Sequence, residues 1–138
     1  MRKRSQSREL ALQILYQIDI TQDPAAQVLD SFWFNYDDKD VEESVKIFTC
    51  QLVKGVEDNL KVIDTKIANC AKNWELERMA VVDRNILRLG VFEIIFCGDI
   101  PSKVSINEAV ELAKKYSDIQ AGKFVNGILD KIKSEHVK

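Results

Sequence analysis

The sequence predicts an all-α fold in a single domain. Apolar residues recur three and four positions apart along the chain, which is the spacing of one face of a helix. Strand-like alternation is almost absent, and five glycines and two prolines leave little for a sheet. A chain of 138 residues buries enough surface to fold without disulfides or metals.

The first helix is expected at about residues 5–19. Its core stripe, spaced at about 100° per residue, consists of Leu10, Ala11, Ile14, Leu15 and Ile18. Leu12, Gln13 and Tyr16 point the other way. An exposed leucine and tyrosine need a cover, which another helix of the chain, a partner or a nucleobase would supply.

Three more helices follow in the N-terminal half. Asp23 and Pro24 predict a helix start, as an N-cap followed by proline at the first helical position. An acidic loop then enters a third helix, whose first turn favours acidic side chains. The acidic residues of this segment are Asp37, Asp38, Asp40, Glu42 and Glu43. A fourth helix is expected at about residues 60–72.

Residues 81–97 are expected to form the most buried helix, because apolar side chains occupy almost all of its faces. Glu93 lies among them and needs a partner, for which Arg84 and Arg88 are candidates. Residues 98–101 end this helix.

Residues 104–132 predict two short amphipathic helices. Ser105 and Glu108 have the spacing of a capping box. In the second helix, Asn126 and Gly127 interrupt an apolar stripe. We expect Gly127 to let another helix approach closely and Asn126 to hydrogen-bond inside the interface, with Asn107 as a candidate partner. A direct chemical role is the alternative.

The composition argues against several classes of protein. Three widely separated cysteines favour neither a disulfide framework nor a zinc site, and the single histidine, His136, lies in the C-terminal tail. Phosphate-binding loops and nucleophile motifs are missing, so we expect no enzyme, no cofactor and no bound metal. Neither a signal peptide nor a membrane span is indicated, and a cytoplasmic protein is expected.

The basic N-terminus is the main functional signal. Arg2, Lys3, Arg4 and Arg8 fall within the first eight residues, which contain no acidic residue. Cations at a helix N-terminus oppose the helix dipole, so a negatively charged partner is plausible. Arginine suits phosphate because its planar fork donates two hydrogen bonds. A disordered basic tail that only aids solubility is the equal alternative.

Single-stranded RNA is the favoured partner of this arm. No helix carries the basic stripe of a DNA recognition helix, and the formal net charge is −2. A few arginines can hold phosphates while unstacked bases lie against rings such as Tyr16 or Phe124. With about three to five phosphates engaged, the logarithm of the affinity should fall with log salt at a slope of roughly −2 to −3.5.

Four sequence blocks stand out: RELALQILY at 8–16, DRNILR at 83–88 leading to Glu93, IP followed by VSINEAVELAK at 100–114, and KFVNGILD at 123–130. Together they resemble the NusB family of bacterial transcription antitermination factors. Their order and spacing extend the resemblance over essentially the whole chain. The resemblance implies two three-helix subdomains, at about 1–75 and 76–138.

The resemblance also implies a function. Family members bind the boxA element of ribosomal RNA leader transcripts together with NusE, ribosomal small-subunit protein ten, and the complex lets RNA polymerase read through terminators. The implied RNA-binding residues are Arg2, Lys3, Arg4, Arg8, Gln13 and Tyr16, with Lys123 and Phe124 as neighbours. The NusE-facing surface maps to Asp83 and Arg84. Because the arginines of this arm are interrupted at residues 5–7, RNA binding without NusE should be weak.

Two other functions fit the same fold. The first is that of a protein adaptor, which docks a partner helix on Leu12 and Tyr16 and does not bind RNA. The second follows from a resemblance to the domain that positions the substrate in ribosomal RNA cytosine methyltransferases. A complete methyltransferase would need a long additional domain to bind the methyl donor. An outward-facing Leu12 leaves a homodimer open as well.

Overall fold

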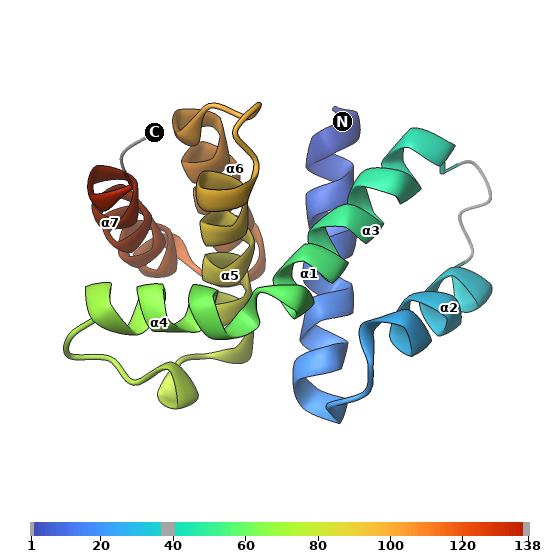
Figure 1. The fold of residues 1–138 in the computed structure, drawn as a ribbon, viewed down its shortest axis with the longest axis horizontal. Coiled ribbons are helices and arrows are strands. Elements are labelled where there is room, and N and C mark those ends of the chain that lie inside the picture. Colours follow the sequence, from blue (N-terminus) through green and yellow to red (C-terminus); the bar gives the residue numbers. More distant parts are fainter. Residues whose placement is uncertain (1, 37–40, 137–138) are drawn as a thin grey trace. The chain divides into compact units, whose positions relative to one another are not determined.

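The computed structural model describes residues 2–36 and 41–136, and these residues form helices and connecting segments with no strand (Figure 1). The helices are α1 (Lys3–Thr21), α2 (Ala25–Asn35), α3 (Glu43–Asp58), α4 (Leu60–Cys70), α5 (Val81–Phe96), α6 (Ser102–Tyr116) and α7 (Ile119–Glu135), with a short 3-10 helix, η1 (Leu76–Arg78). The predicted all-α class is confirmed. In the predicted acidic loop, Asp37, Asp38 and Asp40 lie outside the described residues, whereas Glu43 stands in the first turn of α3.

The chain divides into two compact units. Unit 1 is Met1–Asp58 and holds α1 to α3, while unit 2 is Asn59–Lys138 and holds α4 to α7. Helix α4 belongs to unit 2 because it packs against α5 and α7. The division therefore comes before α4, whereas the expected subdomain boundary lay near residue 75, after it.

In unit 1, α1 packs against α2 and α3. Every residue of its predicted core stripe is buried except Ile18, which is half-buried. Leu12, on the outer strip of the helix, was expected to be covered by another helix, a partner or a nucleobase, and with only 3% of it exposed it is covered within this chain. Three consecutive buried residues, Leu10 to Leu12, span more than half of the helix circumference. Leu12 thus offers no apolar patch to a partner or to a second copy.

Helix α2 begins one residue later than predicted. Pro24 is the N-cap, and it has no side-chain oxygen with which to cap the helix. The first free amide of the helix, that of Ala25, donates a 2.7 Å hydrogen bond to Glu57 Oε2 at the end of α3. A carboxylate from a neighbouring helix thus performs the capping role that was predicted for Asp23.

In unit 2, α5 packs against α4, α6 and α7, as its apolar faces predicted. The buried Glu93 accepts a 2.9 Å hydrogen bond from Ser105 Oγ. The predicted capping box is therefore wrong: α6 begins at Ser102, which places Ser105 inside the helix. Arg88, one predicted partner of Glu93, forms a bidentate pair with Asp64 of α4, at 2.9 and 3.0 Å.

The glycine that lets two helices approach closely is Gly90 of α5, not Gly127. A Cβ at Gly90 would lie 2.6 Å from Cδ1 of Leu129 on α7, well inside the optimal carbon separation of about 3.5–4.0 Å. A Cβ at Gly127 would meet no atom within 4 Å, and Asn126 and Asn107 are both exposed. The interior roles predicted for Gly127 and Asn126 are therefore wrong.

Substituting Gly90 with alanine should lower the free energy of unfolding by about 1–3 kcal/mol, because Leu129 is fully buried and has little room to move. Gly127→Ala is the matched control on an exposed helix position and should raise it by up to about 1 kcal/mol. Urea unfolding followed by circular dichroism measures both values. A Gly90→Ala protein as stable as the parent would contradict the tight α5–α7 contact.

Candidate nucleic-acid interface

The basic residues predicted to contact RNA lie at the N-terminal end of α1. Arg2 is its N-cap and Lys3 and Arg4 begin its first turn, and all three are exposed. Lys3 Nζ lies 2.8 Å from Glu42 Oε2, with the two side chains 64% and 59% exposed. An ion pair this exposed to water is weak, so Lys3 can exchange its partner at little cost.

Two arginines of α1 lie over one aromatic ring of α3. Arg4 Cζ is 4.4 Å and Arg8 Cζ 5.7 Å from the centroid of Phe48. Beside them, Ser7 Oγ donates a 2.9 Å hydrogen bond to the carbonyl of Val45. Only 4% of Arg8 is exposed. Arg8 therefore holds the start of α1 against α3. The sequence predicted that Arg8 would contact a phosphate, but in this structure its side chain is buried.

Gln13 and Tyr16 are one turn apart on α1 and both are exposed, Tyr16 by 42%. Their spacing of three residues places them on one strip of the helix. Steps of four and three residues extend this strip back through Glu9 to Arg2, whereas Arg4 lies on the side of α1 that faces Phe48. We call Arg2, Lys3, Arg4, Gln13 and Tyr16 the α1 surface. It offers a cationic end and an aromatic ring along a single helix.

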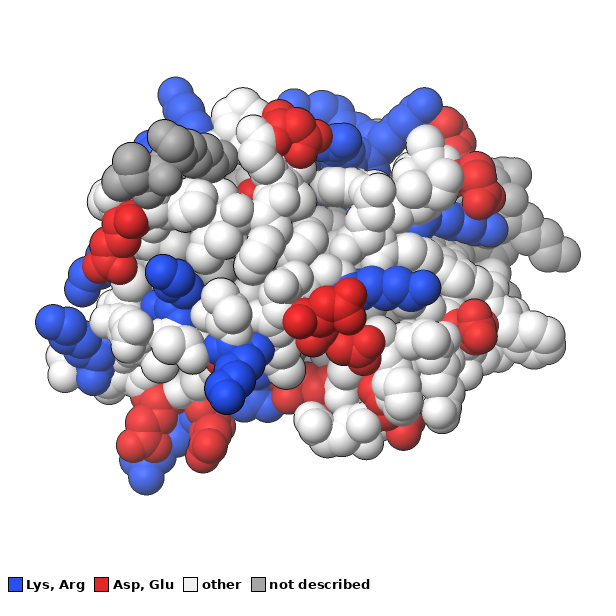
Figure 2. Space-filling model, in the orientation of Figure 1, with Lys and Arg blue, Asp and Glu red and all other residues white. Residues whose placement is uncertain are grey.

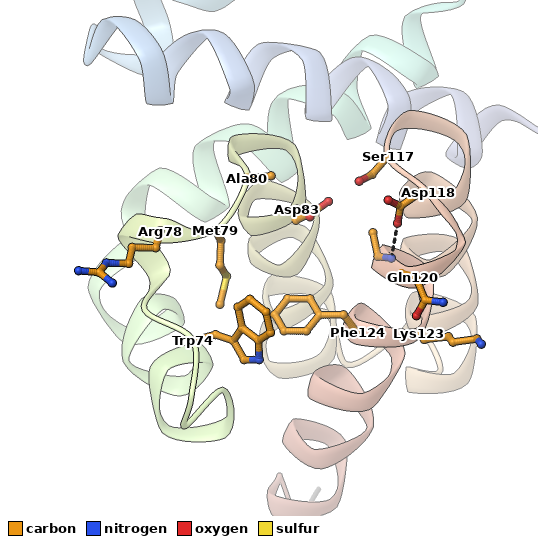
Figure 3. A pocket seen from close by; sticks show the side chains of 11 residues that line it. Trp74, Arg78, Met79, Ala80, Asp83, Ser117, Asp118, Gln120, Lys123 and Phe124 are labelled. Atoms are coloured by element: carbon orange, nitrogen blue, oxygen red, sulfur yellow. Dashed lines mark hydrogen bonds between the residues drawn. The ribbon is translucent and has the colours of Figure 1, made fainter.

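Lys123 and Phe124 lie at a cavity of about 560 Å³ in unit 2 (Figure 3). We call it the aromatic pocket; it is lined by Trp74, Arg78, Met79, Ala80, Asp83, Ser117, Asp118, Gln120, Ala121, Lys123 and Phe124. The rings of Trp74 and Phe124 meet edge to face, with centroids 5.5 Å apart at an interplanar angle of 67°. Helix α7 begins at this cavity, where the carboxylate of Asp118 accepts a 2.7 Å hydrogen bond from the amide of Ala121.

The two residues predicted to face NusE have different surroundings. Asp83 lines the aromatic pocket, and its Oδ1 is buried without a hydrogen-bond partner among the described residues. Burial raises the pKa of Asp83, a hydrogen bond with Ser117 lowers it, and the charge of Asp118 raises it further. Arg84 is half-buried, and its Nη1 lies 3.4 Å from the carbonyl oxygens of Leu76 and Glu77, which ties η1 to α5.

The raised pKa of Asp83 predicts a pH-dependent cost to folding. Its protonated form is favoured in the folded state, so its contribution to stability is present at low pH and is lost as the pH rises through the folded pKa. Asp83→Asn should therefore raise the melting temperature at pH 7.5 by a few degrees. The gain should vanish below the ordinary carboxyl pKa of about 4. Thermal unfolding across this range would contradict the prediction if the gain were the same at every pH.

The predicted residues fall into two groups, each within its own unit. Unit 1 holds the α1 surface, and unit 2 brings Lys123 and Phe124 to the same pocket as Asp83. Trp74 was not among the predicted site residues, because it lies between α4 and η1, where no helical periodicity singles it out. The available signal was a tryptophan in a connecting segment, where binding residues are common.

The described part of the chain contains no cluster of three or more His, Cys, Asp or Glu residues that could hold a metal ion. None of its helices combines the length and apolar character needed to cross a membrane. The Cys70 thiol lies 3.6 Å from Glu135 Oε2. Burial raises the pKa of Cys70, and the Glu135 carboxylate raises it further.

An all-helical domain with a cationic helix end and an aromatic pocket has the features of a binding protein. The chain belongs to the NusB family, whose pattern matches residues 5–134. It is 46% identical over 132 residues to the transcription antitermination protein NusB of Anaeromyxobacter dehalogenans, with 96% of this chain and 91% of that protein covered. It is 42% identical over 133 residues to the NusB of Myxococcus xanthus, at 96% and 95% coverage.

Solved structures show the same fold. T. maritima NusB superposes with a TM-score of 0.88 and 37% identity, covering 98% of this chain and 93% of that one. A chain from the crystal structure of antitermination factors NusB and NusE in complex with double-stranded RNA gives a TM-score of 0.88 and 30% identity, with 99% of both chains covered. The family membership implied by the four sequence blocks is therefore confirmed.

Proposed function

We propose that the protein is a transcription antitermination factor that binds boxA RNA of ribosomal RNA leader transcripts together with NusE and promotes read-through by RNA polymerase. The observation that carries this proposal is the similarity, over 99% of both chains, to a chain solved in a complex of NusB, NusE and RNA. Relatives at 46% and 40% identity carry the same functional name. The protein acts by binding and is not an enzyme, and we place it in the cytoplasm.

The α1 surface supplies the first RNA contacts. Arg2, Lys3 and Arg4 reach phosphates, and Tyr16 offers a ring to an unstacked base. Acidic and basic side chains both occur on the face shown in Figure 2, and the exposed cations at the start of α1 are the ones proposed to hold the RNA. Lys123 and Phe124 supply contacts from unit 2.

The NusE contact is proposed around Asp83 and Arg84. Both belong to the N-terminal half of α5, where Arg84 braces η1. A partner that covers this region adds contacts to the complex, which the N-terminal arm alone supplies with few arginines. We therefore expect weak RNA binding by the protein alone and stronger binding with NusE.

The adaptor alternative loses its main support. It required Leu12 as a docking residue, and Leu12 is buried. The methyltransferase-domain alternative is less well supported than antitermination, because the relatives that match over nearly their whole length are named antitermination proteins.

Fluorescence anisotropy with labelled boxA RNA and a scrambled RNA of the same composition tests the proposal. We expect tighter binding to boxA than to the scrambled RNA, and a further gain when NusE is added. Equal affinity for the two RNAs, with and without NusE, would refute the proposed function. Equal boxA affinity with and without NusE would refute the dependence on the partner.

A further inference from the structure

Given the RNA binding proposed above, we infer that the aromatic pocket of unit 2 receives one unpaired nucleobase, which stacks on the indole of Trp74. The cavity volume of about 560 Å³ falls within the range of about 300–1,000 Å³ that is usual for small-molecule sites. All of its lining residues belong to one unit, so the site is complete within unit 2.

Trp74 has the properties of a stacking platform. It is 60% exposed although it is a large apolar side chain. Phe124 supports it edge to face from α7, and Figure 3 shows the two rings side by side at the cavity. A ring that is held from one side and open to solvent on another can accept a base without rearrangement. Such stacking tolerates any base, because every base has a π-face.

The charges around the pocket favour a nucleotide. Lys123 is exposed next to Phe124, and Arg78 is also exposed, with its Nε 3.3 Å from Glu75 Oε2. These two cations attract the phosphodiester on either side of an inserted base. A cationic side chain of a protein partner would have to pass both of them.

The inner end of the pocket suits a neutral ring with N–H groups. The half-buried Asp83 lies there, with its Oδ1 buried, whereas Asp118 is exposed at the start of α7 and accepts a hydrogen bond from the amide of Ala121. The Asp83 carboxylate repels a phosphate but accepts hydrogen bonds from the amino groups of a base. The pocket thus separates the two parts of a nucleotide, with the base inside and the phosphates at the rim.

Tryptophan fluorescence gives a direct test. The chain has two tryptophans, and Trp33 lies in unit 1, packed against Phe32 with ring centroids 5.2 Å apart. Trp33→Phe leaves Trp74 as the only tryptophan. We expect boxA RNA, with NusE present, to quench Trp74 emission along the same binding curve that anisotropy reports. A protein lacking both tryptophans supplies the background from NusE.

Two series sharpen this test. Trp74→Leu should weaken boxA binding by about 5- to 150-fold, the range that corresponds to one lost base stack, whereas Trp33→Phe should leave the affinity unchanged. In boxA RNAs made abasic at one nucleotide at a time, loss of the quenching at a single position would identify the inserted base.

The outcomes separate this inference from the proposed function. RNA binding seen by anisotropy without any change in Trp74 emission would overturn the inference and leave the proposed function standing. Quenching of Trp74 by NusE alone, with no further change on adding RNA, would also overturn it, since the pocket would then hold a protein group. No binding of boxA RNA under any condition would overturn both. The emission test keeps Trp74 in place, so it does not depend on whether Trp74→Leu folds.

Discussion

Replacing both Arg2 and Arg4 by alanine is expected to lower the affinity for boxA RNA about 10- to 100-fold. This loss corresponds to about 1.5–3 kcal/mol for the two contacts together, the range for one hydrogen bond to a charged group, because both side chains are exposed to water at the start of α1. Each lost phosphate contact should also reduce the salt slope by about 0.7 for single-stranded RNA. Anisotropy titrations at several salt concentrations measure both effects, and thermal unfolding checks that the fold is retained.

The matched control removes two positive charges elsewhere. Lys131 and Lys133 are exposed at the far end of α7, and their replacement by alanine should leave the RNA affinity within about twofold, because exposed cations separated from a phosphate by more than about 10 Å are screened. Equal affinities of the two double variants would exclude the α1 surface as the RNA contact.

Arg8→Ala should differ from both double variants. Its main effect should be the loss of packing against Phe48 and hence a lower free energy of unfolding.

Removing Arg88 is expected to have the largest effect on stability among the ion pairs described here. Its side chain is 12% exposed and that of Asp64 26%, and the two form a bidentate pair between α5 and α4. Arg88→Ala leaves the largely buried Asp64 carboxylate without this partner, which should lower the free energy of unfolding by about 3 kcal/mol. Urea unfolding at neutral pH measures the loss.

A surface ion pair provides the comparison. Arg78 and Glu75 are 83% and 71% exposed, so Arg78→Ala should change the stability by no more than about 1 kcal/mol. The double variant Arg88→Ala with Asp64→Ala should recover part of the loss, because it leaves no charge unpaired. A loss as small for Arg88→Ala as for Arg78→Ala would show that the α4–α5 pair contributes little.

The helices could be predicted from the sequence because their apolar spacing is a property of each segment alone. The core stripe of α1 and the heavily buried α5 follow from that spacing. The start of α6 was placed wrongly because Ser105 and Glu108 have the spacing of a cap. The structure uses Ser105 for a buried hydrogen bond to Glu93 of another helix, and no local pattern reveals such a contact.

The candidate site was predictable only in part, for the same reason. Tyr16 is exposed, as the spacing of the first helix predicted, whereas Lys123 was selected only through the family resemblance. The burial of Arg8 could not be foreseen, because it depends on Phe48, which lies far along the chain and is brought close only by the packing of α1 on α3. Trp74 escaped notice because a connecting segment has no periodicity to interpret.

The cysteines offer a way to follow the two units in solution. Because the raised pKa of Cys70 keeps its thiol protonated beside Glu135, it should react slowly with maleimide dyes at neutral pH. The half-buried Cys50 and Cys97 belong to unit 1 and unit 2 respectively. Labelling at these two natural positions would equip each unit with one fluorophore, so energy transfer between them could report how their separation responds when a transcript is captured.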